Sequence, residues 1–148
     1  MNLKHTISIL LITFLLTSCS KNDDNNQNNN PNIPNVSFDT QTLIDTSLPQ
    51  YNQMQFPGNY ILLNSNYGIK GVVLYYSGSD YSAFELSDPN HPISSCSKLT
   101  VNGITATCGC ADENAYEILN GAKLDGGQYT MTRYNVEVNG SIIRVYNN

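Results

Sequence analysis

The chain has 148 residues, and its 7 Lys and Arg against 12 Asp and Glu give it a formal net charge of −5. Ten tyrosines, no tryptophan and recurring short runs of Val, Ile and Thr favour strands over helices. An acidic chain without a basic stripe repels polyanions, so we expect no nucleic-acid partner.

The amino-terminal segment has the pattern of an exported leader. Residues 7–16 are apolar apart from one Ser and one Thr. That run is too short to span a bilayer as a helix, which needs about 20 residues, but it suits the core of a signal peptide. Residues 16–19 follow as Leu-Thr-Ser-Cys, which resembles the lipobox of bacterial lipoproteins. The resemblance implies a signal peptide over residues 1–18 and a mature chain that begins with a lipid on Cys19.

The alternative at this site is an ordinary signal peptide with a chance cysteine, although secreted proteins rarely leave an unpaired Cys beside a cleavage site. Lipidation at Cys19 predicts a cell-envelope protein that is bound to the membrane through its acyl chains. Lys21, Asp23 and Asp24 also resemble the short acidic export signals of some Gram-negative surface lipoproteins. They would place the protein on the outer face of the outer membrane, whereas a merely polar linker would leave the face undefined.

Residues 19–35 are predicted to form a lipidated tether. They are dominated by Asn, contain two Pro and include one large apolar side chain, Ile33. Such a segment buries too little apolar surface to offset the entropy of ordering, so we expect it to be disordered. Residues 36–148 then remain as one domain with one core.

Within that domain, short apolar-rich runs separated by turn residues predict an all-β fold. The predicted strands cover residues 36–38, 43–45, 60–63, 69–76, 81–86, 98–101, 104–108, 115–118, 129–138 and 141–146. Asn102-Gly103 and Asn139-Gly140 predict two-residue hairpin turns, because both residue types tolerate positive φ. Closely spaced hairpins without a helical repeat predict a small antiparallel sandwich or barrel.

Histidine content limits the chemistry of the mature chain. His5 would be removed with the signal peptide, which leaves His91 as the one histidine. A Ser-His-Asp triad would need an activated serine, and the chain has no Gly-x-Ser-x-Gly elbow. No phosphate-binding glycine loop follows a strand and opens a helix. Since spacing sets no acid–base pair or nucleophile, we expect a protein with no catalytic residues.

Three cysteines, Cys96, Cys108 and Cys110, lie close together in the sequence. Disulfides persist outside the cytoplasm, so two of these cysteines are expected to pair. A bridge between Cys108 and Cys110 would close only with strain, but physical reasoning does not choose which of the two pairs with Cys96. A zinc site formed with His91 is the other possibility, although Cys-x-Cys is tighter than the usual zinc-binding spacing.

The same segment carries a family resemblance. Residues 88–90 read Asp-Pro-Asn, and residues 108–111 read Cys-Gly-Cys-Ala. They stand in the order and at about the spacing of two cluster-binding loops, Cys-x-His and Cys-x-x-His, and Tyr116 falls within a residue of the aromatic that follows the second loop. Residues 58–148 therefore resemble a Rieske domain, which implies a small antiparallel β fold.

The ligand positions that this resemblance implies are degenerate. They read Asp88, Asn90, Cys108 and Ala111. A Rieske cluster needs two Cys and two His, and Cys108 alone could ligate as the family does. We therefore expect no metal and no cofactor. The leading hypothesis is a lipoprotein with a Rieske-like fold that has lost its cluster ligands and is a non-catalytic structural or interaction module.

The resemblance also implies a choice of disulfide. In the Rieske proteins of respiratory complexes, a Cys two residues after the second-loop ligand pairs with a Cys that follows the first loop. That precedent implies a Cys96–Cys110 bridge and leaves Cys108 as a reduced, buried thiol.

Two other functions are weighed against this hypothesis. One is a Rieske-type electron-transfer protein with an intact cluster, which the ligand count opposes. The other is a surface module that binds a glycan or a protein, which predicts an exposed aromatic patch formed by Tyr75, Tyr76, Tyr81 and Tyr129. The sequence does not define which protein or glycan partner such a module would bind.

Overall fold

The computed structural model describes residues 30–125 and 127–148. The predicted signal peptide, the lipidated Cys19, the acidic export signal and the first part of the tether lie outside these residues. The lipoprotein interpretation therefore stays a prediction. Among the described residues, no helix is long and apolar enough to cross a membrane.

Within the described residues the secondary structure consists of ten strands and one short 3-10 helix. In chain order these are β1 (Phe38–Asp39), β2 (Ile44–Asp45), η1 (Asn52–Gln55), β3 (Tyr60–Leu63), β4 (Val72–Tyr76), β5 (Tyr81–Glu85), β6 (Leu99–Asn102), β7 (Thr105–Cys108), β8 (Ala115–Glu117), β9 (Arg133–Asn139) and β10 (Ile142–Asn147). Each predicted strand overlaps an observed one, and the all-β fold class is confirmed.

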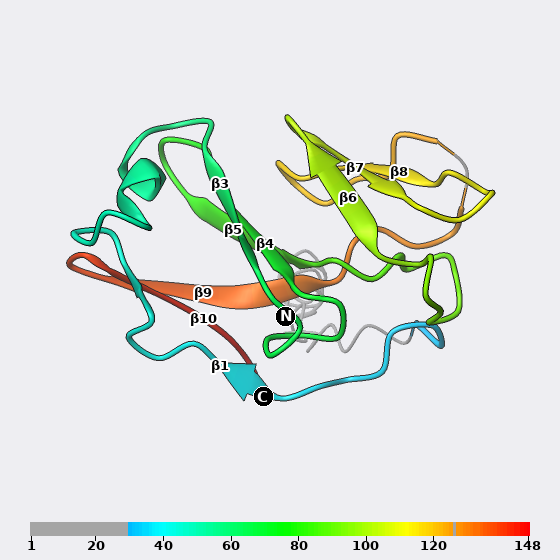
Figure 1. The fold of residues 1–148 in the computed structure, drawn as a ribbon, viewed down its shortest axis with the longest axis horizontal. Coiled ribbons are helices and arrows are strands. Elements are labelled where there is room, and N and C mark those ends of the chain that lie inside the picture. The colour runs from blue at the N-terminus through cyan, green and yellow to red at the C-terminus, as the bar shows by residue number, and fades with distance from the viewer. Residues whose placement is uncertain (1–29, 126) are drawn as a thin grey trace, which may run out of the picture.

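The strands form two antiparallel sheets. The larger has the order β1-β10-β9-β5-β4-β3, with β2 also paired to β10, and the smaller has the order β6-β7-β8. Figure 1 shows the long β9–β10 hairpin running across the domain, with β3, β4 and β5 to one side of it and the smaller sheet set apart. The sequence segment between β5 and β9 therefore forms a separate layer that carries all three cysteines of the domain.

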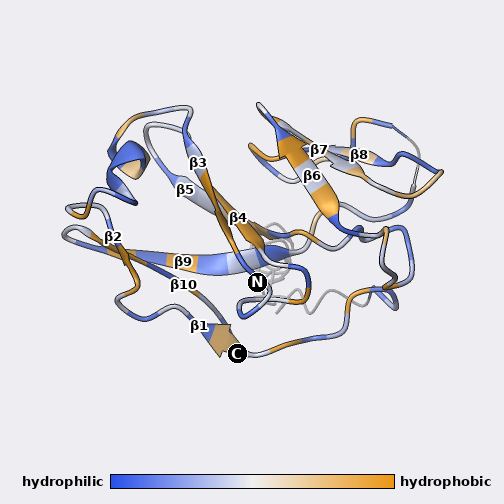
Figure 2. Cartoon of the chain, viewed as in Figure 1, coloured by the Kyte–Doolittle hydropathy of each residue, from blue (hydrophilic) through white to orange (hydrophobic). Residues whose placement is uncertain are grey.

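Two hydrophobic clusters fill the domain, and β4 contributes to both. Successive side chains on a strand point to opposite faces. Val73 and Tyr75 consequently pack in the cluster shared with the smaller sheet, whereas Val72 and Leu74 pack in the cluster inside the larger sheet. Figure 2 shows the apolar character of β4 and of β6, which lie on the two sides of the shared cluster. The shared cluster thus fixes the position of the smaller sheet on the larger one.

The two hairpin turns lie one residue later than predicted. Asn102 pairs with Thr105 and Asn139 pairs with Ile142, so each asparagine ends a strand. The loops begin at the following glycines, where φ is 59° at position 103 and 60° at position 140. A glycine with positive φ in the first loop position is what a type II′ turn requires. The hairpins are present as predicted, but their loops are Gly-Ile and Gly-Ser.

The end of the predicted disordered tether is packed against the domain, so that boundary is wrong for residues 30–35. Asn30 and Ile33 are each 5% exposed. Asn30 Nδ2 and Asn32 Nδ2 donate hydrogen bonds to the carbonyl oxygen of Pro89, at 2.8 and 3.0 Å. The segment is ordered because its amide side chains bind a carbonyl 57 to 59 residues away. Composition alone cannot reveal such a partner.

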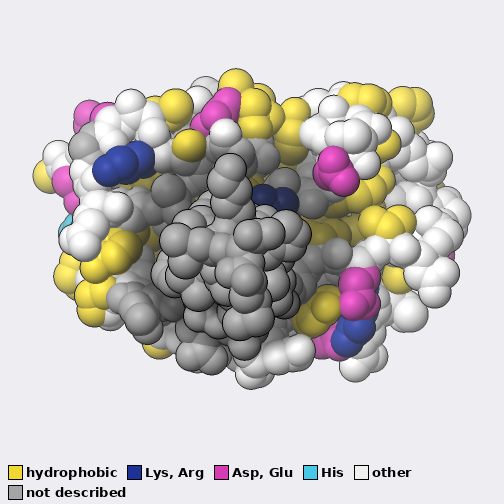
Figure 3. All heavy atoms as spheres, turned by 180° about the vertical axis from the view of Figure 1, so that it is seen from behind, with side chains coloured by type: hydrophobic (Ala, Val, Ile, Leu, Met, Phe, Trp, Pro, Cys, Tyr) yellow, Lys and Arg dark blue, Asp and Glu magenta, His cyan; other side chains and the backbone are white. Residues whose placement is uncertain are grey.

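Charged side chains of both signs are scattered over the described surface. On the face seen in Figure 3, Lys and Arg side chains form separate small groups, and Asp and Glu side chains are scattered over the same face. Arg144 forms ion pairs with Asp39 and Glu137, at 2.7 and 2.9 Å. Among the described residues on this face, the basic side chains do not gather into a stripe.

Candidate functional site

Three loops meet at one end of the smaller sheet and carry most of the predicted site residues. The first loop joins β5 to β6 (residues 86–98), the second joins β7 to β8 (residues 109–114), and the third joins β8 to β9 (residues 118–132). A disulfide links the first loop to the second, and side-chain hydrogen bonds link the first loop to the third. These links make the three loops one structural unit.

Cys96 and Cys110 form the disulfide, with their Cα atoms 4.9 Å apart. This is the pair that the resemblance to Rieske domains implied, and the Cys96–Cys108 alternative does not occur. Cys108 is a free, buried cysteine. Because Cys96 and Cys110 are bonded to each other, the zinc site considered from sequence lacks its thiolates in this oxidised state.

Asp88 is fully buried and accepts three hydrogen bonds. Its carboxylate is bound by the hydroxyl of Tyr116, by Asn114 Nδ2 at 2.9 Å and by the backbone amide of Asn90 at 2.9 Å. Burial raises the pKa of Asp88, but these hydrogen bonds outweigh burial and hold the pKa below its ordinary value. Asp88 is therefore an ionised carboxylate that binds three segments of chain together.

Asn90 uses its whole hydrogen-bonding capacity within the loops. Its Nδ2 donates to the Tyr116 hydroxyl at 2.8 Å and to the carbonyl oxygen of Tyr129 at 2.7 Å. Its Oδ1 accepts from the backbone amides of Gln128 and Tyr129, at 2.6 and 2.8 Å. Two donors and two lone pairs are all that a primary amide offers. The side chain consequently fastens the first loop to the third and has no free donor or acceptor for a ligand.

Cys108 and Ala111 are the other two positions implied as cluster ligands. Cys108 ends β7 and is 4% exposed. Burial, and then the neighbouring Asp88 carboxylate, raise the pKa of its thiol to about 12, although the amide of Cys110 opposes this shift. The group is thus a neutral thiol near neutral pH. Ala111 is exposed and has no donor atom.

The four positions do not fit a two-iron Rieske cluster. Such a cluster needs two thiolates and two imidazoles in fixed geometry. Here Asp88 and Asn90 are already bound by hydrogen bonds within the protein, one position is a buried neutral thiol, and one is an alanine. His91 lies next to Asn90, and even as a substitute it could supply only one imidazole.

The four tyrosines predicted as an exposed patch do not form one. Tyr75 is 8% exposed and packs in the shared cluster. Tyr76 and Tyr81 lie on the opposite face, where their rings stack at 4.3 Å, and Tyr129 belongs to the third loop. The prediction fails because neighbouring strand residues point to opposite faces. All four side chains are buried or half-buried.

Sequence reasoning missed a second buried carboxylate, Glu85, which is fully buried at the end of β5. Its Oε1 accepts from the amides of Lys70 and Ser87, each at 2.8 Å. Its Oε2 accepts from the amide of Ile69 at 2.8 Å and from the hydroxyl of Tyr134 at 2.6 Å. The available signal was its position two residues after an inward-facing alanine, which places it on the core side of β5.

A shallow, open depression of about 560 Å³ lies beside η1 and β3, away from the three loops. Its titratable side chains are Tyr51 and Tyr60, among amides and aliphatic groups. It thus brings together no carboxylate, imidazole or thiol.

No protein-family model matches this chain, and no curated protein matches it. Solved structures do show similarity. A chain in the complex of reduced oxygenase and oxidized ferredoxin of carbazole 1,9a-dioxygenase is 23% identical, with 61% of this chain and 82% of that chain covered and a TM-score of 0.43. The ferredoxin of carbazole 1,9a-dioxygenase from Nocardioides aromaticivorans IC177 is 14% identical, with 65% and 91% covered and a TM-score of 0.44.

A third structure comes from Mycobacterium tuberculosis and is described as a putative NADH-dependent nitrite reductase small subunit. It is 18% identical, with 77% of this chain and 98% of that chain covered and a TM-score of 0.42. At these identities and TM-scores, the three structures do not assign the chain to a family.

Proposed function

We propose that this chain is a membrane-anchored lipoprotein of the cell envelope whose Rieske-like β domain has lost its iron–sulfur ligands. In this proposal the domain is a structural or interaction module and not an enzyme. The lipobox-like residues 16–19 support the anchor, and the order of the two loop motifs at residues 88–90 and 108–111 supports the Rieske-like ancestry.

One observation carries the proposal. The side chains at the first-loop ligand positions, Asp88 and Asn90, are fully engaged in holding the loops together. A metal cluster at this place would have to break these bonds and leave buried polar groups unpaired, which costs about 1–3 kcal/mol for each group. The loops are thus held by hydrogen bonds where a Rieske domain would be held by metal ligands.

The chemistry of the remaining groups supports a non-enzymatic role. Both buried carboxylates, Glu85 and Asp88, already accept hydrogen bonds at both oxygens. Cys108 is a neutral thiol, and a thiol is a far weaker nucleophile than a thiolate. None of these groups is free to take a proton from a substrate or to attack it.

The cluster is tested by expression of the full chain under anaerobic conditions with added iron, followed by electron paramagnetic resonance of the reduced protein. A Rieske ferredoxin prepared in parallel is the positive control. We expect no Rieske-type signal and no iron above background. A signal equivalent to one cluster per chain would overturn the proposal in favour of an electron carrier.

The anchor is tested through Cys19. Wild-type protein should partition into detergent and start at a lipid-modified Cys19, whereas Cys19→Ala should accumulate as unprocessed precursor. Cys108→Ser is the matched control, because it removes a cysteine of the folded domain and should be processed normally. Normal maturation and lipid attachment of the Cys19→Ala variant would refute the anchor.

A further inference from the structure

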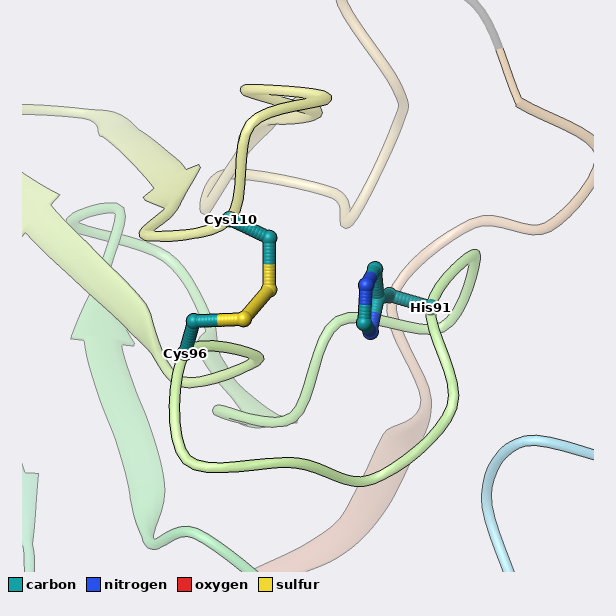
Figure 4. Close-up of side chains that lie close together, drawn as sticks. All are labelled: His91, Cys96 and Cys110. Carbon is teal, nitrogen blue, oxygen red and sulfur yellow. A yellow bond between two sulfur atoms is a disulfide. The ribbon is translucent and has the colours of Figure 1, made fainter.

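The Cys96–Cys110 disulfide lies beside the imidazole of His91 (Figure 4). One ring nitrogen of His91 and the two sulfur atoms lie within 4.8 Å of one another. The first loop supplies His91 and Cys96, and the second loop supplies Cys110. Sulfur and imidazole nitrogen are the donors that zinc prefers in proteins. The disulfide therefore occupies a place where reduced side chains would form a zinc-binding donor set.

The neighbouring carbonyl group fixes the orientation of the His91 ring. Nδ1 lies 2.7 Å from the carbonyl oxygen of Pro92. A carbonyl oxygen only accepts hydrogen bonds, so in neutral His91 the proton resides on Nδ1 and Nε2 keeps its lone pair. A carbonyl that holds the second ring nitrogen is the arrangement that orients metal-binding histidines. In that tautomer Nε2 is the ring nitrogen whose lone pair can bind a metal.

The disulfide is reachable from one side. Cys96 is exposed and His91 is half-buried, whereas Cys110 is 8% exposed. A thiol reductant or a metal ion can therefore approach from the Cys96 side, while the Cys110 sulfur stays on the protein side of the site. Zinc sites with three protein ligands keep a water or another small molecule in the fourth position.

We propose that reduction of the Cys96–Cys110 disulfide converts this cluster into a zinc site held by His91, Cys96 and Cys110. A dithiol reductant supplies two electrons and two protons, the S–S bond breaks to give two thiols, and the reductant ends as its own disulfide. Zn²⁺ then binds both sulfurs as thiolates, releases their two protons to solvent and takes Nε2 of His91 as its third ligand. A water molecule completes the tetrahedron.

Breaking the S–S bond also makes room for the ion. Two sulfur ligands of one tetrahedral zinc ion lie about 3.8 Å apart, as follows from Zn–S bonds of about 2.3 Å. That separation is close to the contact distance of two unbonded sulfur atoms. Reduction thus moves the two sulfurs toward the spacing that zinc requires.

Cys108 and the exposed Asp112 also have donor atoms within 4.8 Å of the Cys110 sulfur, but they belong to a group that does not include His91 or Cys96. Cys108 is held in the core at the end of β7, where its sulfur accepts a hydrogen bond from the Cys110 amide at 3.5 Å. These facts leave Cys108 outside the ligand set and make it the matched control.

The test uses the full chain in detergent with Cys19→Ala in every arm, so that three cysteines remain. Protein reduced with a water-soluble phosphine and protein left oxidised are titrated with Zn²⁺ against a chromophoric chelator. We expect one zinc per reduced chain and at least 100-fold weaker binding to the oxidised chain. His91→Ala should weaken binding to the reduced chain at least tenfold, and Cys108→Ser should leave it unchanged within twofold.

Cobalt gives an independent readout, because Co²⁺ in a thiolate site produces a sulfur-to-metal charge-transfer band. That band should appear in the reduced wild type and the reduced Cys108→Ser variant, and it should be absent in Cys96→Ser. Equal zinc affinity of the oxidised and reduced chains, or an unchanged affinity in His91→Ala, would overturn the proposal. Loss of zinc in Cys108→Ser would overturn the ligand set.

Unfolding curves distinguish loss of the zinc site from loss of the folded structure. Zinc should raise the unfolding midpoint of the reduced wild type and should not raise that of the reduced His91→Ala variant, because a ligand that binds the folded state stabilises it. If zinc leaves the midpoint of the reduced wild type unchanged, the site does not exist.

Discussion

Two buried carboxylates only three positions apart in sequence stabilise different parts of this domain. Glu85 accepts three backbone amides and one tyrosine hydroxyl, and it joins the β3–β4 loop to β5 and β9. Asp88 accepts one backbone amide and the side chains of Tyr116 and Asn114, and it joins the first loop to β8 and the second loop. Most donors to Glu85, in the larger sheet, are thus backbone amides. Most donors to Asp88, in the loops, are side chains.

The tyrosine partners of the two carboxylates are alike. Burial raises the pKa of Tyr134 and of Tyr116, and in each case the facing carboxylate raises it further. Both hydroxyls therefore stay protonated and donate. The two regions differ in the remaining donors, which are backbone amides at Glu85 and include the Asn114 side chain at Asp88. The stability of the loop region should therefore depend more strongly on individual side chains and on the disulfide. Four predictions test this difference, from the largest expected effect to the smallest.

Glu85→Gln should be the most damaging single change. An amide group offers two donor hydrogens where four donors of the protein now point at the carboxylate, so buried amides would be left unpaired. We expect a loss of about 4 kcal/mol in the free energy of unfolding, measured by urea denaturation. Glu113→Gln, at an exposed position, should change stability by less than about 0.5 kcal/mol. A loss below about 1 kcal/mol for Glu85→Gln would contradict the assigned role.

Cys96→Ser should destabilise the loop region next most strongly. The disulfide joins residues separated by 14 positions, and closing a loop of that size adds about 3 kcal/mol in the chain-entropy model. The melting temperature should fall clearly, and hydrogen exchange should rise in the first and second loops before it rises in β9 and β10. Cys108→Ser leaves the bridge intact and should lower the melting temperature much less. Equal losses in the two variants would contradict this prediction.

Asn90→Ala should cost about 2 kcal/mol, because it removes four hydrogen bonds and leaves the Tyr129 and Gln128 amides without their acceptor. The third loop should become the most susceptible site of limited proteolysis. Asn66→Ala, on the exposed β3–β4 loop, is the matched control and should be neutral. If the third loop of Asn90→Ala remains as resistant as in wild type, the amide does not hold it.

Acid should weaken the loop region through Asp88. Its folded-state pKa lies below the unfolded value of about 3.9, so its stabilising contribution is complete above that pH and is lost as pH falls through the folded-state pKa. Asp88→Asn should reduce stability at pH 7 and flatten its decline below about pH 4. Urea denaturation of both proteins at stepped pH measures the two slopes. Parallel curves for wild type and Asp88→Asn would show that other groups cause the acid loss.

The sequence predicted features that depend on local patterns. Strand positions and hairpins were recovered because alternation and turn residues act within a few positions. The one-residue error in the position of the two turns also has a local cause. Glycine occupies the loop position that requires positive φ, so each preceding asparagine is the last residue of its strand. The choice of Cys110 as the partner of Cys96 came from the family resemblance, since local geometry favoured neither candidate.

What the sequence did not predict depends on distant partners. Asn90 binds a carbonyl 39 positions away, and Asn30 binds one 59 positions away. Such pairs leave no periodic signal, so the sequence indicates Asn90 only as a lost ligand position and Asn30 only as part of a polar tether. Alternation along β5 indicates only the face on which Glu85 lies. Its four donors come from three separate segments of chain, and no local pattern predicts them.

The contact of Asn30 and Asn32 with Pro89 also has a mechanical consequence. Both amides donate to one carbonyl of the first loop, and Ile33 is buried next to them in sequence. A pulling force applied through the amino-terminal chain therefore acts first on this contact and only afterwards on the pairing of β1 with β10. A force on the amino-terminal side thus acts on the first loop, which contains Cys96 of the disulfide, before it acts on the larger sheet.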